Sequence, residues 1–228
     1  MSIDLNHIYN MDCLEGMREI PDKSIDLVIT DPPYGIGEAA GKNKKRCGIL
    51  FGKPGSMLWG KDYGDLEWDN IPATNEQIKE MSRISNNQII FGGNYFDLPP
   101  SPCWLVWDKD NGGNDFADCE LAWTSFKTAV RKFTYRWNGM LQEDMSHKEE
   151  RFHPTQKPIK LFEWIIKNYA KEGDVICDPF LGSGASMVAA IRLGHPFIGF
   201  EKEKVYFDVA QIRIKKAQEQ GKLGEWFE

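Results

Sequence analysis

Residues 174–201 read DVICDPFLGSGASMVAAIRLGHPFIGFE and decide the fold class. A short apolar strand, Val175–Cys177, leads into a glycine-rich turn, a helix from Gly184 to Leu193 and a second apolar strand, Phe197–Phe200. Strands that alternate with helices in this way form parallel sheets, because the helix carries the chain back across the sheet. The stretch therefore predicts an α/β fold in which helices flank a mostly parallel sheet.

The same alternation extends over most of the remaining chain. Apolar runs predict strands at 25–30, 88–91, 103–107 and 120–123, and helical spacing predicts helices at 75–85, 159–170 and 205–220. Residues 35–71 break the pattern, because they are glycine-rich and have no clear periodicity. With 228 residues, no internal repeat and no low-complexity linker, we expect a single domain over 1–228.

Composition excludes several classes of protein. Lys and Arg number 28 against 34 Asp and Glu, and 41% of the residues are hydrophobic, as in ordinary globular chains rather than disordered or histone-like ones. No apolar run reaches the about 18 residues of a membrane span, and the first residues lack a secretory signal, so we expect no membrane partner. The five cysteines are scattered without a CxxC pair, which predicts reduced thiols, a cytoplasmic location and no metal.

The segment Asp31-Pro32-Pro33-Tyr34 directly follows the predicted strand 25–30. Ligands of open α/β sheets bind at such strand ends. The prolines fix the backbone and carry no amide donor, so the carbonyls of Asp31 and Pro32 remain acceptors beside a carboxylate. These acceptors, next to the flat face of Tyr34, suit a planar molecule with an exocyclic amino group. The competing interpretation is a plain proline-rich turn.

A second candidate site follows the strand 175–177 and opens the next helix. Gly182 and Gly184 let the backbone approach a ligand closely. The loop lacks both the GxGxxG and the GK[ST] pattern of phosphate loops, and alone it is as typical of a plain strand-to-helix turn. Glu201 ends the next strand, where an acidic residue binds ribose hydroxyls in nucleotide-binding folds. Together they predict a nucleoside-binding half, whose cofactor is a nucleoside with an amino-acid tail.

These two segments together resemble the S-adenosylmethionine-dependent DNA amino-methyltransferases, which methylate N6 of adenine or N4 of cytosine. The catalytic motif precedes the cofactor motif, as in the β group of that family. Residues 10–27 and 153–158 (HPTQKP) resemble further family motifs, and similarity is weaker at 91–95 and 104–109. The resemblance implies a Rossmann-like class I methyltransferase fold, permuted so that the cofactor half is C-terminal. It also implies S-adenosylmethionine as cofactor, S-adenosylhomocysteine as product and no metal.

The resemblance assigns the catalytic role to Asp31, Pro32, Pro33 and Tyr34. Asp31 and the Pro32 carbonyl would accept the hydrogens of the target amino group, so that its nitrogen attacks the methyl group directly while Tyr34 stacks on the base. Such an enzyme flips its target base out of the duplex, because the amino group is otherwise paired.

The resemblance also implies a set of cofactor-binding positions. They are Asp12 for the adenine, Glu201 for the ribose, Thr155 and Lys157 for the polar tail, and Asp178, Phe180, Gly182, Ser183 and Gly184 for the methionine end. A loop cap is the competing interpretation for Asp12, and a solvated first-turn lysine is the competing interpretation for Lys157.

Two basic stretches stand out in this acidic chain and predict a double-stranded DNA partner, because phosphate contacts need local Lys and Arg. The irregular insert 35–71 and the candidate target-recognition segment 127–152 supply Lys42, Lys44, Lys45, Arg46, Arg131, Lys132 and Arg136. Arginines of the second stretch are suited to reading guanine edges. The competing interpretation is a solvated basic surface. The segment is short for the family's recognition region, which favours modest sequence specificity or action as a homodimer.

We expect adenine-N6 methylation, because many cytosine-N4 relatives carry Ser at the position of Asp31. Cytosine-N4 methylation by the same residues is the nearest alternative. RNA or protein methyltransferases more often carry Asn there and place the cofactor half first. A silent nucleic-acid-binding relic is a further alternative, which the intact Asp31, Tyr34, Gly182, Gly184 and Glu201 oppose. We expect the protein to act in a bacterial or phage-infected cell, as a restriction-modification methylase or a phage methylase.

Overall fold

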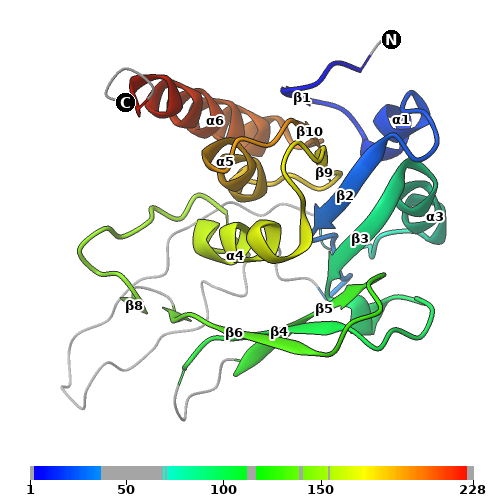
Figure 1. Ribbon diagram of the computed structural model, residues 1–228, viewed down its shortest axis with the longest axis horizontal. Helices are drawn as coiled ribbons and strands as arrows, with labels where there is room; N and C mark the ends of the chain where they lie inside the picture. Colours follow the sequence, from blue (N-terminus) through cyan, green and yellow to red (C-terminus); the bar gives the residue numbers. More distant parts are fainter. Residues whose placement is uncertain are drawn as a thin grey trace.

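An eight-stranded sheet forms the centre of the computed structural model, which describes residues 3–36, 69, 71–111, 117–138, 141–153 and 155–224 (Figure 1). Its strand order is β1-β10-β9-β2-β3-β5-β4-β6. The strands are β1 (His7–Tyr9), β2 (Ile25–Thr30), β3 (Ser85–Phe91), β4 (Trp104–Asp108), β5 (Cys119–Thr124), β6 (Arg131–Thr134), β9 (Ile176–Asp178) and β10 (Phe197–Phe200). A separate pair joins β7 (Trp137–Asn138) to β8 (Leu141–Gln142).

Five adjacent strands, from β1 to β3 in the sheet order, run parallel. Strand β5 is antiparallel to both β3 and β4, and β6 is parallel to β4. From β2 the chain continues to β3, whereas from β9 it continues to β10 on the other side. The order in which the chain adds strands therefore reverses between the parallel neighbours β9 and β2. Ligands of open α/β sheets bind outside the carboxyl ends of the strands at such a reversal.

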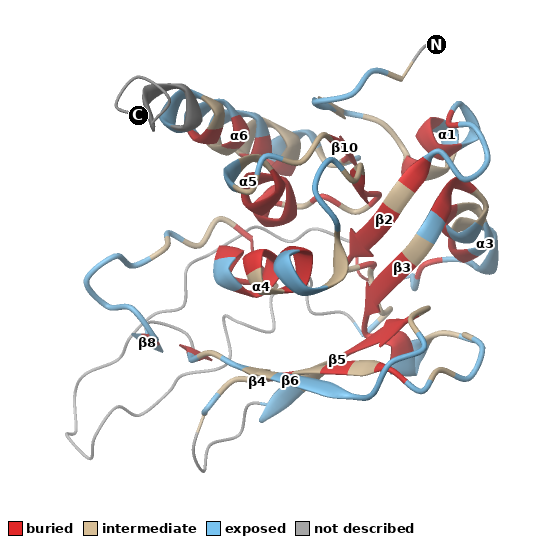
Figure 2. Ribbon diagram, in the orientation of Figure 1, coloured by how far each residue is buried: buried red, intermediate tan, exposed pale blue. Residues whose placement is uncertain are grey.

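Helices cover both faces of the sheet (Figure 1). On one side lie α1 (Cys13–Arg18) and α3 (Asn75–Ile84), and on the other lie α4 (Ile159–Tyr169), α5 (Ala185–Arg192) and α6 (Lys204–Gly224). Strand β2 serves both layers, because Leu27 and Ile29 join the core under α4 to α6, while Val28 joins the core under α1 and α3. Figure 2 shows that β2, β3 and α5 are largely buried.

Helix α5 lies deepest, because it packs between α4 and α6 and its residues 185–190 are all buried. Gly184 precedes it with a left-handed backbone, φ +79°. A Cβ at Gly184 would lie 3.1 Å from Cβ of Ala210 in α6, so small side chains at both positions allow this close approach. The prediction of a helix that begins beside Gly184 is confirmed.

Some elements differ from the prediction. Strand β3 begins at Ser85 rather than at Gln88, because its polar first residues still pair with β2, Ser85 opposite Ile25. Strand β6 forms in the basic stretch after Lys127, where we expected no strand, because it pairs with β4 and becomes the edge of the sheet. Among the described residues, no helix is long and apolar enough to span a bilayer.

Candidate active site

A cavity of about 370 Å³ opens at the carboxyl ends of β2, β9 and β10, where the strand order reverses. Its wall includes Asp31 and Pro33 after β2, residues 178–183 after β9 and residues 200–203 from the end of β10 onward. Residues 71–74, 153 and 155–157 also contribute to its wall. The two predicted sites, far apart in the sequence, therefore line one cavity.

The Asp31 carboxylate is bound through both of its oxygens. Tyr34 donates its hydroxyl to Oδ1, and the Lys157 ammonium contacts Oδ2 at 2.5 Å. The Lys157 side chain is only 3% exposed, and its Nζ also lies 3.0 Å from Oε2 of Glu120. Burial raises the pKa of the Asp31 carboxyl, although Lys157 acts to lower it. Burial acts to lower the pKa of Lys157, but the two carboxylates outweigh it and raise that pKa.

Tyr34 is held from several sides. Its ring stacks on Tyr95 with centroids 4.8 Å apart, and its backbone amide donates to Oδ1 of Asp69 over 2.9 Å. Gly92 adopts φ +64°, and a Cβ there would lie only 2.1 Å from Cε1 of Tyr34. Glycine at position 92 therefore makes room for the ring. The Pro33 carbonyl accepts a hydrogen bond from Ala73 N over 3.0 Å, which ties the motif to the segment before α3.

Asp178 joins strands rather than pointing a free carboxylate at the cavity. It is 3% exposed and accepts hydrogen bonds from Thr30 Oγ1 at 2.7 Å, Ser186 Oγ at 2.5 Å and Phe180 N at 3.1 Å. Burial raises the pKa of Asp178 to about 6, although these hydrogen bonds act to lower it. Asp178 therefore stabilises the loop after β9 through hydrogen bonds that it accepts within the protein interior.

Glu201 presents a carboxylate beside the same loop. Its Oε2 accepts a hydrogen bond from Gly182 N, and its Oε1 accepts one from Glu203 N, both at 2.7 Å. Burial raises the pKa of Glu201 to about 7, although the two amides act to lower it. Gly182 has φ +54°, and a Cβ there would meet only the His153 ring, at 3.9 Å. The loop at Gly182 thus leaves open space beside the Glu201 carboxylate.

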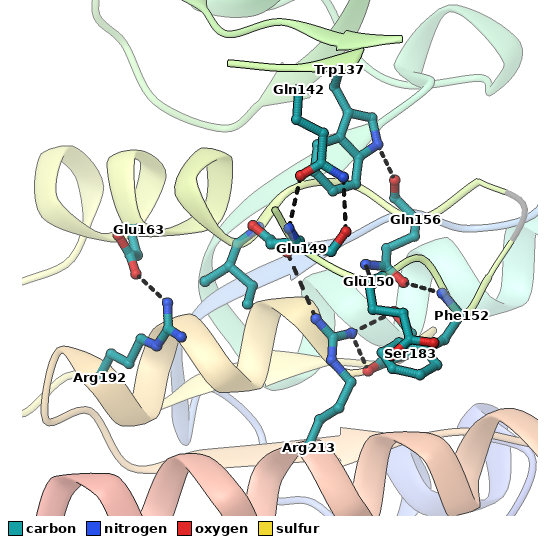
Figure 3. A network of polar contacts seen from close by, with 11 residues as sticks. Trp137, Gln142, Glu149, Glu150, Phe152, Gln156, Glu163, Ser183, Arg192 and Arg213 are labelled. Carbon is teal, nitrogen blue, oxygen red and sulfur yellow. Dashed lines mark hydrogen bonds and ion pairs between the residues drawn. The ribbon is translucent and has the colours of Figure 1, made fainter. Parts of the chain in front are cut away.

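Arg213 of α6 joins the loop to two other segments (Figure 3). Its Nη1 donates to Ser183 O at 2.6 Å and to Ser183 Oγ at 2.8 Å, and its Nη2 lies 3.8 Å from Oε2 of Glu149. Glu149 Oε1 in turn accepts from Ile159 N at 3.0 Å, which satisfies an amide in the first turn of α4. One largely buried guanidinium therefore supports the cavity loop, α6 and the start of α4.

Of the remaining predicted cofactor positions, Asp12, Thr155 and Lys157 line the cavity, whereas Gly184 is not among its lining residues. Asp12 also caps α1, as its competing interpretation held, by accepting from Leu14 N at 2.9 Å. Thr155 lies beside His153, with Oγ1 3.1 Å from Nδ1. The interpretation of Lys157 as a solvated lysine is wrong, because the side chain is buried against Asp31 and Glu120.

The predicted DNA-binding residues divide into two groups. Lys42, Lys44, Lys45 and Arg46 lie outside the described residues. In the second stretch, Lys132 pairs with Asp108 at 3.0 Å and Arg136 pairs with Asp110, so part of its positive charge is neutralised at the end of β4. Arg131 is exposed at the edge strand β6.

Four residues that support the site escaped the sequence analysis: Thr30, Lys109, Glu120 and Arg213. Glu120 carried a signal, because it is a carboxylate at the start of an otherwise apolar strand. Thr30 carried a weaker one, as the polar last residue of β2. Lys109 and Arg213 are indistinguishable in sequence from surface residues.

Solved structures share this fold and define its class, the class I methyltransferase fold. M1.HpyAVI, solved as a complex with SAM, superposes with a TM-score of 0.54 at 23% identity and covers 91% of this chain and 98% of its own. PvuII DNA methyltransferase, which is cytosine-N4-specific, gives a TM-score of 0.58 at 16% identity and covers 96% and 93%. The predicted fold class is confirmed.

Sequence comparison gives the family. A family model for DNA methylases, N6_N4_Mtase, matches residues 68–212, and the chain belongs to this family. The type II methyltransferase M.HinfI of Haemophilus influenzae is 29% identical over an alignment of 252 positions that covers 93% of this chain and 69% of that protein. M2.LlaDCHI of Lactococcus lactis subsp. cremoris is 26% identical over an alignment of 257 positions that covers 94% of this chain and 91% of that protein. The protein is therefore a DNA methyltransferase.

Proposed function

We propose that this enzyme transfers a methyl group from S-adenosylmethionine to the N6 amino group of an adenine flipped out of duplex DNA. The observation that carries the proposal is the meeting of Asp31 with Gly182 and Glu201 around one cavity. Acceptors suited to an amino group thus lie beside a cavity suited to a nucleoside, and this supports the proposal.

The cavity residues fit S-adenosylmethionine. A volume of about 370 Å³ falls within the usual range for small-molecule sites. Glu201 is suited to accept hydrogen bonds from ribose hydroxyls, Phe180 and Leu181 supply apolar wall, and Gly182 keeps the backbone free of a side chain. When bound, S-adenosylmethionine supplies an electrophilic methyl group and leaves as S-adenosylhomocysteine.

The catalytic work falls to acceptors at the end of β2. Asp31 and the Pro32 carbonyl accept the two hydrogens of the target amino group, which keeps the nitrogen lone pair available for attack. The Pro33 carbonyl is already used by Ala73 N. A carboxylate has about four lone-pair sites, so Asp31 accepts the amino hydrogen while Lys157 stays on Oδ2. The nitrogen gains the methyl group and loses one proton, which passes to solvent by way of the Asp31 carboxylate that accepts its hydrogen bond.

An aromatic wall stands beside these acceptors. Tyr34 and Tyr95 stack on one another, and Tyr95 is 50% exposed. Flipped bases pack against aromatic side chains in enzymes that modify them. We therefore assign the stacking of the target base to this pair, with Tyr34 nearest to Asp31.

Adenine is favoured over cytosine by the carboxylate at position 31, following the family resemblance. Cytosine-N4 methylation remains the second candidate, because the same acceptors serve either amino group. The measurement that separates them is nucleoside mass spectrometry of unmethylated duplex DNA incubated with S-adenosylmethionine and enzyme.

The test compares the wild type with Asp31→Ala and with Glu172→Ala as a matched control. Glu172 is exposed in the turn before β9, at the amino end of the strand and away from the cavity. We expect N6-methyladenine from the wild type and from Glu172→Ala, and none from Asp31→Ala, which still binds the cofactor in calorimetry. N4-methylcytosine would move the assignment to cytosine. Full activity of Asp31→Ala would overturn the mechanism.

A further inference from the structure

Glu120 connects two lysines that come from different parts of the fold. It lies in β5, opposite Trp107 of the antiparallel strand β4. Lys109, just after β4, pairs with its Oε1, and Lys157, just before α4, lies 3.0 Å from its Oε2. Lys157 reaches on to Asp31 at 2.5 Å. Lys109, Glu120, Lys157 and Asp31 therefore form a series of alternating charges that ends at the Asp31 carboxylate.

This series determines how Lys157 is held. An ammonium group has three donors on a flexible stem, and a single carboxylate partner leaves its position loosely defined. Two carboxylate partners define the position of the ammonium group more closely than one does. Because Lys157 then stays on Oδ2 of Asp31, the other oxygen, Oδ1, is left for Tyr34 and the target amino group.

We propose that Glu120 is a positioning residue of the active site, which acts through Lys157 to hold the Asp31 carboxylate in the orientation that accepts the target amino hydrogen. The inference rests on the proposed function. Glu120 is not among the residues that line the cavity, and this role goes beyond joining β4 to β5 through its pair with Lys109.

The charges around Asp31 also set the pH at which it ionises. Lys157 and the Tyr34 hydroxyl act to lower the pKa of Asp31, and the Glu120 carboxylate acts to raise it. Asp178 is a further nearby carboxylate, and Lys109, just after β4, pairs with Glu120. Removing the charge of Glu120 therefore lowers the pKa of Asp31, both directly and by leaving Lys157 to Asp31 alone.

The decisive variant is Glu120→Gln, which keeps the shape and removes the charge. We expect kcat to fall about tenfold, as for coupled neighbours in one charge network, with the KM for S-adenosylmethionine unchanged. We also expect the acidic limb of the kcat–pH profile to move to lower pH, because Asp31 must be ionised to accept a hydrogen. Glu120→Asp restores the charge and should recover part of the rate.

The matched control is Glu163→Gln. Glu163 also pairs with a lysine and an arginine, Lys160 at 2.8 Å and Arg192 at 3.1 Å, and it lies outside the cavity wall. We expect its pH profile to match the wild type. An unchanged profile in Glu120→Gln, or a loss of rate matched by an equal loss in Glu163→Gln, would show that Glu120 only supports the fold.

A measurement without substrate separates this inference from the proposed function. The carboxyl carbon of Asp31 can be titrated by NMR in the ligand-free wild type and in Glu120→Gln, with Asp31→Asn to identify the signal. A lower apparent pKa of Asp31 in Glu120→Gln supports the positioning role even if the methylated product proves different. An equal pKa in the two proteins overturns it, whatever the enzyme methylates.

Discussion

Thr30 and Asp178 end two neighbouring parallel strands, and Thr30 Oγ1 donates to Asp178 Oδ1 over 2.7 Å. Both side chains are buried. The bond connects β2, which leads into Asp31, to β9, which leads into the loop of Gly182. The bond thereby fixes the two halves of the cavity relative to each other at the point where the strand order reverses.

Replacing Thr30 with Val keeps the shape and removes the donor. We expect the free energy of unfolding to fall by about 1–3 kcal/mol, because a buried carboxylate loses a partner. The pKa of Asp178, about 6 against an ordinary 3.8, makes the folded protein bind an extra proton between these values. Its stabilising contribution is therefore full below about pH 4 and is lost as the pH rises through about 6. Since Thr30 acts to lower this pKa, the variant should move the loss to higher pH.

Chemical denaturation across pH 4–8 measures both effects. Thr124→Val is the matched control, because Thr124 is also buried in the sheet and donates to the Cys103 carbonyl over 2.8 Å. It should lose stability without a shift along the pH axis. Equal pH curves for the two variants would remove the role assigned to the Thr30–Asp178 bond.

Cofactor affinity should depend on pH through Glu201. Its pKa of about 7 means that the carboxylate, the form that accepts ribose hydroxyls, is a minority at pH 6 and predominates at pH 8. We expect the Kd for S-adenosylmethionine to fall about tenfold over that range. Glu201→Gln should bind weakly and flatten the dependence.

Isothermal calorimetry at several pH values tests this expectation. Glu76→Gln, at an exposed glutamate paired with Arg18, should keep the wild-type dependence. A wild-type Kd that is constant from pH 6 to 8, or a Glu201→Gln variant that retains the slope, would contradict a role of Glu201 in holding the ribose.

Gly92 lies against the Tyr34 ring, and its substitution should disable the active site. A Cβ at position 92 would overlap the ring at 2.1 Å, and φ is +64°. Gly173 provides a matched control, because its φ is +81° but a Cβ there meets nothing within 4 Å. Gly173→Ala should cost only the left-handed strain, about 1–2 kcal/mol, and keep its activity.

Gly92→Ala should lose methylation as well as stability, because Tyr34 must move away from Asp31. Thermal unfolding and the methylation rate, measured for both variants, separate a loss of activity from a loss of stability. If Gly92→Ala methylates DNA as fast as Gly173→Ala, the position of the Tyr34 ring does not limit the reaction.

The class of fold and the two halves of the cavity could be predicted because each depends on local pattern. Apolar strands followed by Asp31-Pro32-Pro33-Tyr34 and by the Gly182–Gly184 loop mark strand ends directly, and parallel strands bring their carboxyl ends to one edge. The place of Glu201 at the cavity follows in the same way, because it is the residue after β10.

The partners of these residues could not be predicted, because they depend on contacts between distant segments. Lys157 is 126 residues from Asp31 and lies in a motif that the resemblance assigns to the cofactor tail. Its burial between two carboxylates follows from the packing of β5 against β3, which no local pattern encodes. The basic residues Lys132 and Arg136 likewise meet acidic partners only once β6 has joined β4.

Arg213 of α6 donates hydrogen bonds to the carbonyl and the hydroxyl of Ser183. Arg213→Met keeps much of the buried stem and removes these bonds. Because hydrogen bonds to charged groups are among the stronger ones, we expect the Kd for S-adenosylmethionine to rise about tenfold as the loop loses its support. Arg192→Met, which breaks only the pair with Glu163 in the same network, should leave the Kd unchanged (Figure 3). Calorimetry on both variants tests this, and an equal Kd for the two would show that the Ser183 loop keeps its shape without Arg213.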